Sequence, residues 1–326
     1  MQISPSIYEH AAKMIGETPW RVSRDEELLY QAHAEAYRIY RHAPIMPGID
    51  IYNLEVEAYG AELAEPFGNA IPAVRCHPFR TIDEIFKLPP INAKVDGRIP
   101  MQLNVAKRLA ETFPEAIVRV PISGPFSIAS NLLGFEQILL EVADRPDHVR
   151  EALQHLVEGQ LSFARGVREV GCDITFFESA ACPPMLSPKL FRQIELPALK
   201  KILTGMGEII GRPIPCIIGG NTCPIVEAML ETGTGYLACP FETDQVAFLE
   251  KVKNRPDVQI RINCDLRIIS SGTKEQIRYE ADRVLRLCQM HPNVCLGTGA
   301  IPYETPTENV LDLIDYVSKH KTNLEF

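Results

Sequence analysis

The sequence lacks three features that mark whole classes of protein. No apolar run approaches the roughly 18 residues that span a bilayer, so we expect no membrane segment. Lysine and arginine (33) are fewer than aspartate and glutamate (42), and the net charge of −9 argues against a nucleic-acid partner. The first five residues, MQISP, lack the basic-then-apolar pattern of a signal peptide. We therefore expect a soluble protein located in the cytoplasm.

The cysteine pattern excludes further classes. No CxxC pair is present, which excludes a zinc ribbon and a thioredoxin-type motif. The nine cysteines are odd in number and lie in a large chain without a secretion signal, so a disulfide framework is not expected. Most of them should be small buried hydrophobic residues, and those at predicted strand ends are the candidates for chemistry.

Short β-rich runs alternate with longer amphipathic stretches, a pattern typical of βα units and a parallel sheet. Eight such runs are predicted strands: residues 18–22, 49–53, 116–120, 173–177, 215–218, 236–238, 258–262 and 294–296. Eight parallel strands close a barrel with a packed interior. We therefore predict an α/β fold, a (β/α)8 TIM barrel, as a single domain over residues 1–326. An N-terminal helical extension and a proline-rich insertion near residues 71–102 complete the prediction.

Helices are predicted between these strands. Apolar residues recur at a spacing near 3.6 in residues 135–142 and 146–170, and further helices are predicted at 273–287 and 307–317. Ser187 and Pro188 are a cap and a first helical residue, so another helix should begin there.

Barrels of this kind build their catalytic sites at the carboxyl ends of the strands. Polar or aromatic residues at or after the predicted strand ends are therefore candidates for substrate binding: Asn53, Glu57, Phe126, Asn221, Asn263 and Thr298. Glu178 and Asp265 are the candidate acid–base residues. The alternative for each polar residue is a loop cap or turn former, and for Glu57 a first-turn acid of a helix.

Several short motifs resemble the uroporphyrinogen decarboxylase superfamily. LGTGAIP at residues 296–302, followed by TPTEN at 305–309, is similar to its closing segment. GPFS at 124–127, the stretch from Cys172 to LP at 196–197, and GNT at 220–222 resemble further family motifs. The similarity covers roughly residues 45–320. It implies either decarboxylation of tetrapyrrole side chains without a cofactor, or zinc-dependent methyl transfer to or from a corrinoid protein.

The chain departs from both branches of that superfamily. Residues 20–26 lack the RQAGRY motif of the decarboxylase, Glu178 replaces its aspartate, and Thr298 replaces a histidine at a position that contacts substrate. These departures argue against uroporphyrinogen decarboxylase itself. The zinc-ligand positions of the methyltransferase branch correspond to Ile217, Gly219 and approximately Gly299, none of which can bind a metal.

A relocated zinc site is the preferred interpretation of these departures. Cys239 and Cys264 follow neighbouring predicted strands, Glu178 could supply an oxygen ligand, and Cys223 is a fallback. Catalytic zinc needs three such protein ligands and one open position. The alternative is that both cysteines are apolar fillers of the core.

The leading functional hypothesis is a methyltransferase that moves a methyl group between a small substrate and the corrinoid of a partner protein. A methyl ether is the favoured substrate, with zinc polarising its oxygen and Glu178, Asp265 or a water supplying a proton. A thiol substrate would instead be activated as a thiolate. Two other hypotheses remain: a metal-free decarboxylase that uses Glu178 and Asp265 as an acid–base pair, and a non-catalytic corrinoid- or partner-binding module. The sequence does not determine the oligomeric state, and a homodimer is one option.

Overall fold

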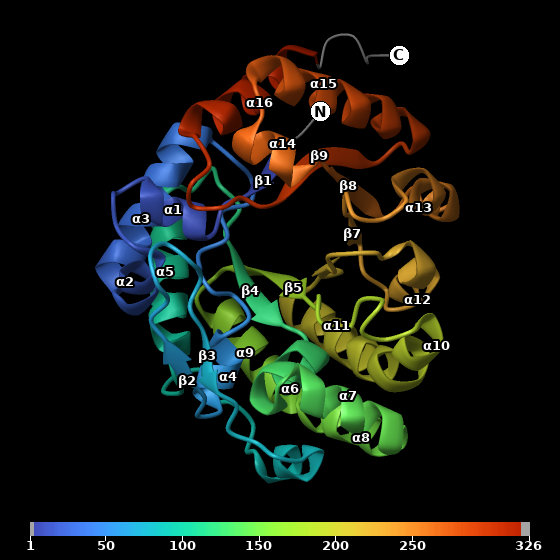
Figure 1. Cartoon of the computed structure of the whole chain (residues 1–326). Helices are drawn as coiled ribbons and strands as arrows, with labels where there is room; N and C mark the ends of the chain where they lie inside the picture. Colours follow the sequence, from blue (N-terminus) through green and yellow to red (C-terminus); the bar gives the residue numbers. More distant parts are fainter. Residues whose placement is uncertain (1–2, 321–326) are drawn as a thin grey trace.

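Seven parallel strands form one curled sheet in the computed structural model, which describes residues 3–320 (Figure 1). The predicted domain also included residues 1–2 and 321–326, which lie outside the described residues. All six neighbouring pairs are parallel. The strand order is β1 (Ile3–Ser6), β9 (Val294–Ala300), β8 (Gln259–Asn263), β7 (Tyr236–Cys239), β6 (Pro215–Ile217), β5 (Asp173–Phe177) and β4 (Arg119–Ser123).

An irregular segment continues the sheet beyond β4. Ile45 forms an isolated parallel bridge with Val118. The Ile45 N–H donates to the Ile117 carbonyl, and the Arg119 N–H donates to the Ile45 carbonyl, both at 2.9 Å. The fold is therefore an α/β barrel with seven regular strands and one irregular element, and the predicted fold class is confirmed.

Two of the eight predicted strands are wrong. Residues 19–22 lie in helix α2 (Pro19–Arg24), which begins at Pro19. Thr18 precedes this helix as its N-cap and accepts a hydrogen bond from the Arg21 N–H at 3.3 Å. Residues 49–53 form turns and precede helix α4 (Leu54–Ala58). The first strand is β1, which was not predicted. Each of the other six predicted runs overlaps an observed strand, with β4 beginning three residues later than predicted.

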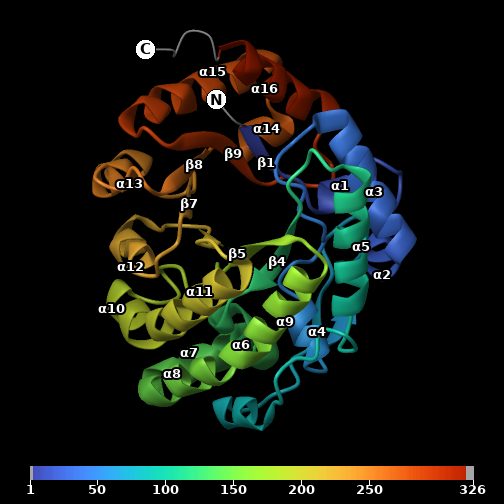
Figure 2. The same cartoon turned by 180° about the vertical axis from the view of Figure 1, so that it is seen from behind.

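Helices surround the outside of the curled sheet in both views (Figures 1 and 2). Helices α1 (Glu9–Lys13), α2 and α3 (Glu26–Tyr40) follow β1, and a hairpin of β2 (Glu62–Ala64) and β3 (Ala73–Cys76) follows α4. The proline-rich segment near 71–102 contains β3, the 3-10 helix η1 (Ile82–Lys87) and the start of α5 (Ile99–Thr112). The remaining helices are α6 (Pro125–Leu133), α7 (Phe135–Asp144), α8 (Pro146–His155), α9 (Val157–Glu169), α10 (Pro188–Leu190), the π-helix η2 (Phe191–Glu195), α11 (Leu196–Ile210), η3 (Cys223–Ile225), α12 (Val226–Leu230), α13 (Gln245–Val252), α14 (Leu266–Ser271), α15 (Lys274–Leu287), η4 (Cys288–Met290) and α16 (Thr307–Lys319).

Two predicted helix starts have the expected capping contacts. The Ser187 side chain accepts from the Leu190 N–H at 3.3 Å before α10. Thr273 and Gln276 form a reciprocal capping box at the start of α15, in which each side chain bonds to the other's backbone N–H. These caps satisfy backbone donors that the helices cannot satisfy themselves.

No single helix among residues 3–320 is long and apolar enough to cross a membrane. Helices α6 and α7 meet the length and composition criterion only as a pair, and they are bent by 113°. The α6 side chains Phe126, Ile128 and Leu132 are fully buried in the protein core.

Alternate side chains of the strands enter two different hydrophobic clusters, because successive residues of a strand point to opposite faces. Leu237, Ile260 and Ile262 belong to the larger cluster, between the strands and the surrounding helices. The smaller cluster fills the inside of the barrel and comprises Tyr8, Met46, Ile51, Phe177, Ile217, Tyr236, Ala238 and Cys295. The parity of a residue along its strand therefore decides whether it faces the barrel interior.

Candidate functional site

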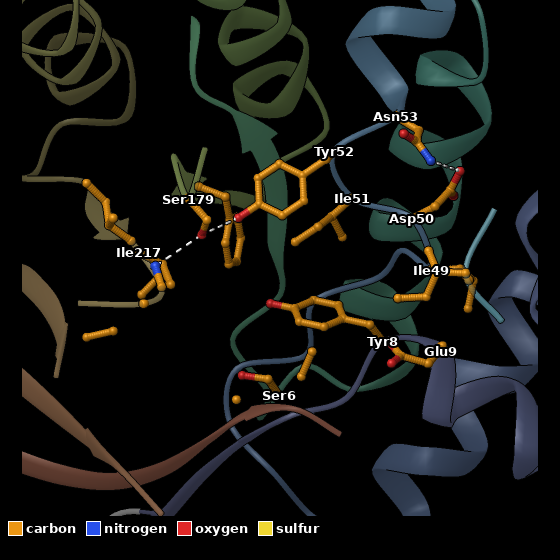
Figure 3. Close-up of a pocket in the computed structure, with 18 of the residues that line it drawn as sticks. Ser6, Tyr8, Glu9, Ile49, Asp50, Ile51, Tyr52, Asn53, Ser179 and Ile217 are labelled. Atoms are coloured by element: carbon orange, nitrogen blue, oxygen red, sulfur yellow. Dashed lines mark hydrogen bonds between the residues drawn. The ribbon is translucent and has the colours of Figure 1, made fainter. Parts of the chain in front are cut away.

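A cavity of about 450 Å³ lies above the inner cluster, at the carboxyl ends of the strands (Figure 3). Residues 49–53, residues 71–74 beside β3, and the ends of β1 and β5 to β9 contribute to its wall. Its accessible surface is mostly apolar, with contributions from Ile49, Ile51 and Ile217. The site thus occupies the place that the barrel fold predicts, and it has the size and polarity of a small-molecule pocket.

Three aromatic side chains form one side of the cavity. The Phe177 ring lies 6.1 Å from Tyr8 and 6.3 Å from Tyr52, edge to face with both. The Tyr52 hydroxyl donates to Ser179 Oγ at 2.7 Å, and Ser179 Oγ also accepts from the Gly219 N–H at 3.0 Å (Figure 3). Burial raises the pKa of both tyrosines well above the usual range, so both hydroxyls stay neutral at physiological pH.

Glu9 is a buried carboxyl group in the cavity wall, at the start of α1. Its side chain follows Tyr8 in sequence and lies beside it in Figure 3. Burial raises the Glu9 pKa to about 7, against the lowering effect of its own backbone N–H. Oε2 is enclosed and has no hydrogen-bond partner among the described residues. Glu9 can therefore hold a transferable proton near neutral pH.

Arg261 lines the cavity from the middle of β8 and is 4% exposed. Its Nη1 donates to Ser6 Oγ at 3.2 Å. Asn263, two residues further along the same face of β8, also lines the cavity, and its Oδ1 is enclosed without a partner in the described chain. This part of the wall supplies polar groups to an otherwise apolar cavity.

A network of charged groups fixes the rim near Asn53. The Asn53 amide donates to Asp50 Oδ2 at 3.1 Å and to the Pro72 carbonyl at 2.7 Å. Asp50 is bound by Arg98 through two hydrogen bonds of 2.9 and 2.7 Å. Glu57 pairs with Arg98 and with Arg24 and does not contribute to the cavity wall. Glu57 lies in the first turn of α4, in agreement with the alternative interpretation that it is a first-turn acid of a helix.

The predicted zinc ligands do not come together. The structure shows no group of three or more His, Cys, Asp or Glu side chains placed to hold a metal within residues 3–320. Cys239 and Cys264 are buried in the outer cluster, facing the helices rather than the cavity. Burial raises the pKa of both thiols well above the usual range, which disfavours the thiolate that zinc requires.

Glu178 also faces away from the cavity. Its carboxyl group accepts from the Phe126 N–H at 3.0 Å and from the N–H and hydroxyl of Ser127 at 3.0 and 2.6 Å, at the start of α6. Burial raises the Glu178 pKa to about 7, although these hydrogen bonds oppose the shift. By contrast, the positions that correspond to the family's zinc ligands, Ile217, Gly219 and Gly299, do line the cavity. The donor set of this cavity therefore does not fit a zinc ion.

The remaining predicted site residues contribute to the structure around the cavity. Phe126 is fully buried in the outer cluster. Asn221 accepts a hydrogen bond from the Thr243 hydroxyl at 3.1 Å, and neither residue lines the cavity. Asp265 caps α14 and forms an ion pair with Arg267 at 2.9 Å, in a separate surface hollow.

Thr298 supports the cavity from behind. It is fully buried, and its Oγ1 accepts from the Ser6 N–H at 3.1 Å. The Ser6 hydroxyl in turn donates to the Thr298 carbonyl at 3.3 Å. Thr298 thus fixes Ser6, which is the residue that lines the cavity.

Of the predicted substrate residues, Asn53 and Asn263 line the cavity. Tyr8, Glu9, Tyr52 and Arg261 line it too but were not predicted. Arg261 could have been found, because a charged residue in the middle of a buried parallel strand is unusual.

A parallel α/β barrel with a cavity at its strand ends belongs to the class of barrels that carry their active sites there. The family described as "Uroporphyrinogen decarboxylase (URO-D)" matches residues 1–320, so the chain belongs to that family. Two curated relatives from Methanosarcina barkeri, named methylcobamide:CoM methyltransferase MtaA, are each 26% identical over 156 residues. This match covers 47% of the chain and 45% of each relative, so the chain matches less than half of their length.

Solved structures support the fold independently. A structure titled "methyltransferase from Methanosarcina mazei" superposes with a TM-score of 0.81 at 21% identity, covering 98% of this chain and 92% of that one. The structure titled "Crystal Structure of SacUVDE" gives a TM-score of 0.51 at 9% identity, covering 98% of each chain. At these identities the similarity concerns the barrel alone.

Proposed function

We propose that the protein is a methyltransferase that moves a methyl group between a small substrate in the strand-end cavity and the corrinoid of a partner protein. Family membership and the relatives named methylcobamide:CoM methyltransferase support this class of reaction. The observation that carries the proposal is the cavity itself, which is apolar and contains the protonatable Glu9.

Cleavage of a methyl ether is the reaction that these residues suit best. The corrinoid of the partner protein would supply the nucleophile that takes the methyl group. The ether oxygen then leaves as an alkoxide or phenoxide unless it receives a proton, and Glu9 is the group in the cavity wall that can donate one near neutral pH. The aromatic wall of Tyr8, Tyr52 and Phe177 would hold the body of the substrate and keep water away.

Zinc assistance was part of the sequence-based prediction but is not part of the proposed mechanism. The inward positions Ile217, Gly219 and Gly299 offer no ligand atoms, and Cys239 and Cys264 face the helices. A thiol substrate would need activation as a thiolate, and residues 3–320 contain no metal-ligand group that would bind its sulfur.

The decarboxylase alternative has no observation in its favour, because its proposed acid–base pair, Glu178 and Asp265, lies outside the cavity wall. A corrinoid protein remains the proposed partner. Location in the cytoplasm and assembly as a homodimer remain predictions from the sequence alone.

The test is methyl transfer from ethers to reduced cobalamin, used as a probe for the partner's corrinoid. Loss of the absorbance of reduced cobalt would be followed with methoxybenzene, 4-methoxybenzoate and methoxyacetate as donors. Glu9→Gln keeps the shape of the side chain and removes the acid, so we expect the rate to fall about 100-fold or more. Transfer from methylcobalamin to thiols, with none from any ether, would overturn the ether proposal.

A further inference from the structure

Arg261 is a buried cation without a counter-ion. No carboxylate within residues 3–320 forms an ion pair or a hydrogen bond with Arg261, and its Nε is enclosed without a partner among those residues. Buried charges in proteins are almost always paired, because desolvation of a lone charge is costly. Arg119, which also points into the barrel but near its amino end, follows this rule through Asp173 at 2.9 Å.

The structure holds the Arg261 side chain in one place. A Cβ at Gly297 would overlap Arg261 Cγ and Cδ, so the glycine leaves the space that the arginine stem fills. The guanidinium is fixed at its other end by the hydrogen bond to Ser6, whose backbone N–H is itself bound by Thr298. Gly297 and Ser6 thus position this arginine in the cavity wall, and a positioned arginine suits bidentate recognition of a carboxylate.

None of the acidic residues in the cavity wall is the counter-ion of Arg261. Asp50 lines the cavity but is bound by Arg98 through two hydrogen bonds. Glu9 is not among the ion-pair partners of any described residue, and Glu242 lies exposed at the rim. The partner of Arg261 must therefore come from the ligand.

We propose that Arg261 binds a carboxylate of the substrate, so that the methyl donor is a small apolar or aromatic molecule with one acidic group. The aromatic wall contacts its body, and Arg261 fixes its acidic end. This substrate class rests on the proposed function, but its test measures binding and needs neither corrinoid nor turnover.

Calorimetric titration with 4-methoxybenzoate and its neutral isostere 4-methoxybenzamide tests the proposal on the wild-type protein. We expect the acid to bind at least about 30-fold more tightly than the amide, as expected for a buried charge pair. Arg261→Met should abolish this preference, and Arg261→Lys should restore part of it. Arg255→Met is the matched control, since Arg255 lies on the surface just before β8 and pairs with Asp257. It should keep the preference.

Equal binding of acid and amide to the wild-type protein would overturn the proposal without requiring any variant to fold. A preference that survives Arg261→Met would overturn it as well. Competition by inorganic sulfate shows whether the site accepts any oxyanion or selects carboxylates. If sulfate displaces 4-methoxybenzoate at a similar concentration, carboxylate recognition is refuted. Acid binding without methyl transfer would refute the proposed function and leave this site in place.

Discussion

Replacing Glu195 by glutamine should flatten the pH dependence of folding. Glu195 is fully buried in the π-helix η2, and its carboxyl group interacts with that of the buried Glu178. Burial, followed by the charge of Glu178, raises the Glu195 pKa well above its usual value. Glu178 accepts hydrogen bonds from the start of α6, so Glu195 is the member of the pair that keeps its proton.

The magnitude follows from the proton that folding retains on Glu195. In the unfolded chain this carboxyl titrates near pH 4.5, whereas in the folded protein its pKa is higher. A raised pKa gives stability that is fully present below the unfolded pKa and is lost as the pH rises toward the folded pKa. The loss is about 1.4 kcal/mol for each pH unit that lies between the unfolded and the folded pKa of Glu195. Glutamine needs no proton, so this contribution should vanish in the variant.

Urea unfolding of both proteins across that pH range measures the difference directly. Other buried carboxyls with raised pKa values, such as Glu9 and Glu55, are present in both proteins and cancel in the comparison. Glu111→Gln, at an exposed position on α5, is the matched control and should run parallel to the wild type. If the unfolding free energies of wild type and Glu195→Gln change in parallel with pH, within about 0.5 kcal/mol, Glu195 does not keep a proton in the folded protein.

Two further predictions concern the cavity. If Glu9 is the proton donor, the rate of methyl transfer should fall about tenfold per pH unit above about pH 7, because the donor loses its proton there. A flat pH–rate profile that Glu9→Gln leaves unchanged would contradict this role. The triple variant Ile217→His, Gly219→Cys and Gly299→Cys should bind one zinc ion per chain, since all three positions line the cavity. A Cβ at either glycine would lie 3.3 Å or more from its nearest neighbour, so the cavity has room for both cysteines. Zinc analysis after dialysis measures this, and a triple variant that folds but retains no more zinc than the wild type would show that the positions do not converge.

Six of the seven strands could be predicted from the sequence, because each is an apolar run followed by turn residues. The first strand could not, because Ile3–Ser6 is short, contains Pro5 and has few apolar residues. It is stable as a strand through parallel pairing with β9. Thr18 and Pro19 were read as part of a strand, although together they form a strong helix start.

The face of each strand was harder to predict than its position. Parallel strands in a barrel are buried on both faces, so apolar residues do not reveal which face is inside. Cys239 and Cys264 were therefore placed at the site although they face the helices. Arg261 indicates which face of β8 points into the cavity, because a charged side chain is not expected among the helices. Asn263 lies on the same face as Arg261, and Cys264 lies on the opposite face.

A substitution that fills the strand-end cavity tests most directly whether this cavity is the methyl-donor site. Ala238 is buried, faces the barrel interior from β7 and lines the cavity, so Ala238→Phe should occupy part of its roughly 450 Å³. With 4-methoxybenzoate and reduced cobalamin, the wild-type protein should form methylcobalamin, and the variant should do so at least about 100-fold more slowly while unfolding at a similar temperature. Equal rates of methylcobalamin formation in both proteins would contradict the assignment of this cavity as the methyl-donor site.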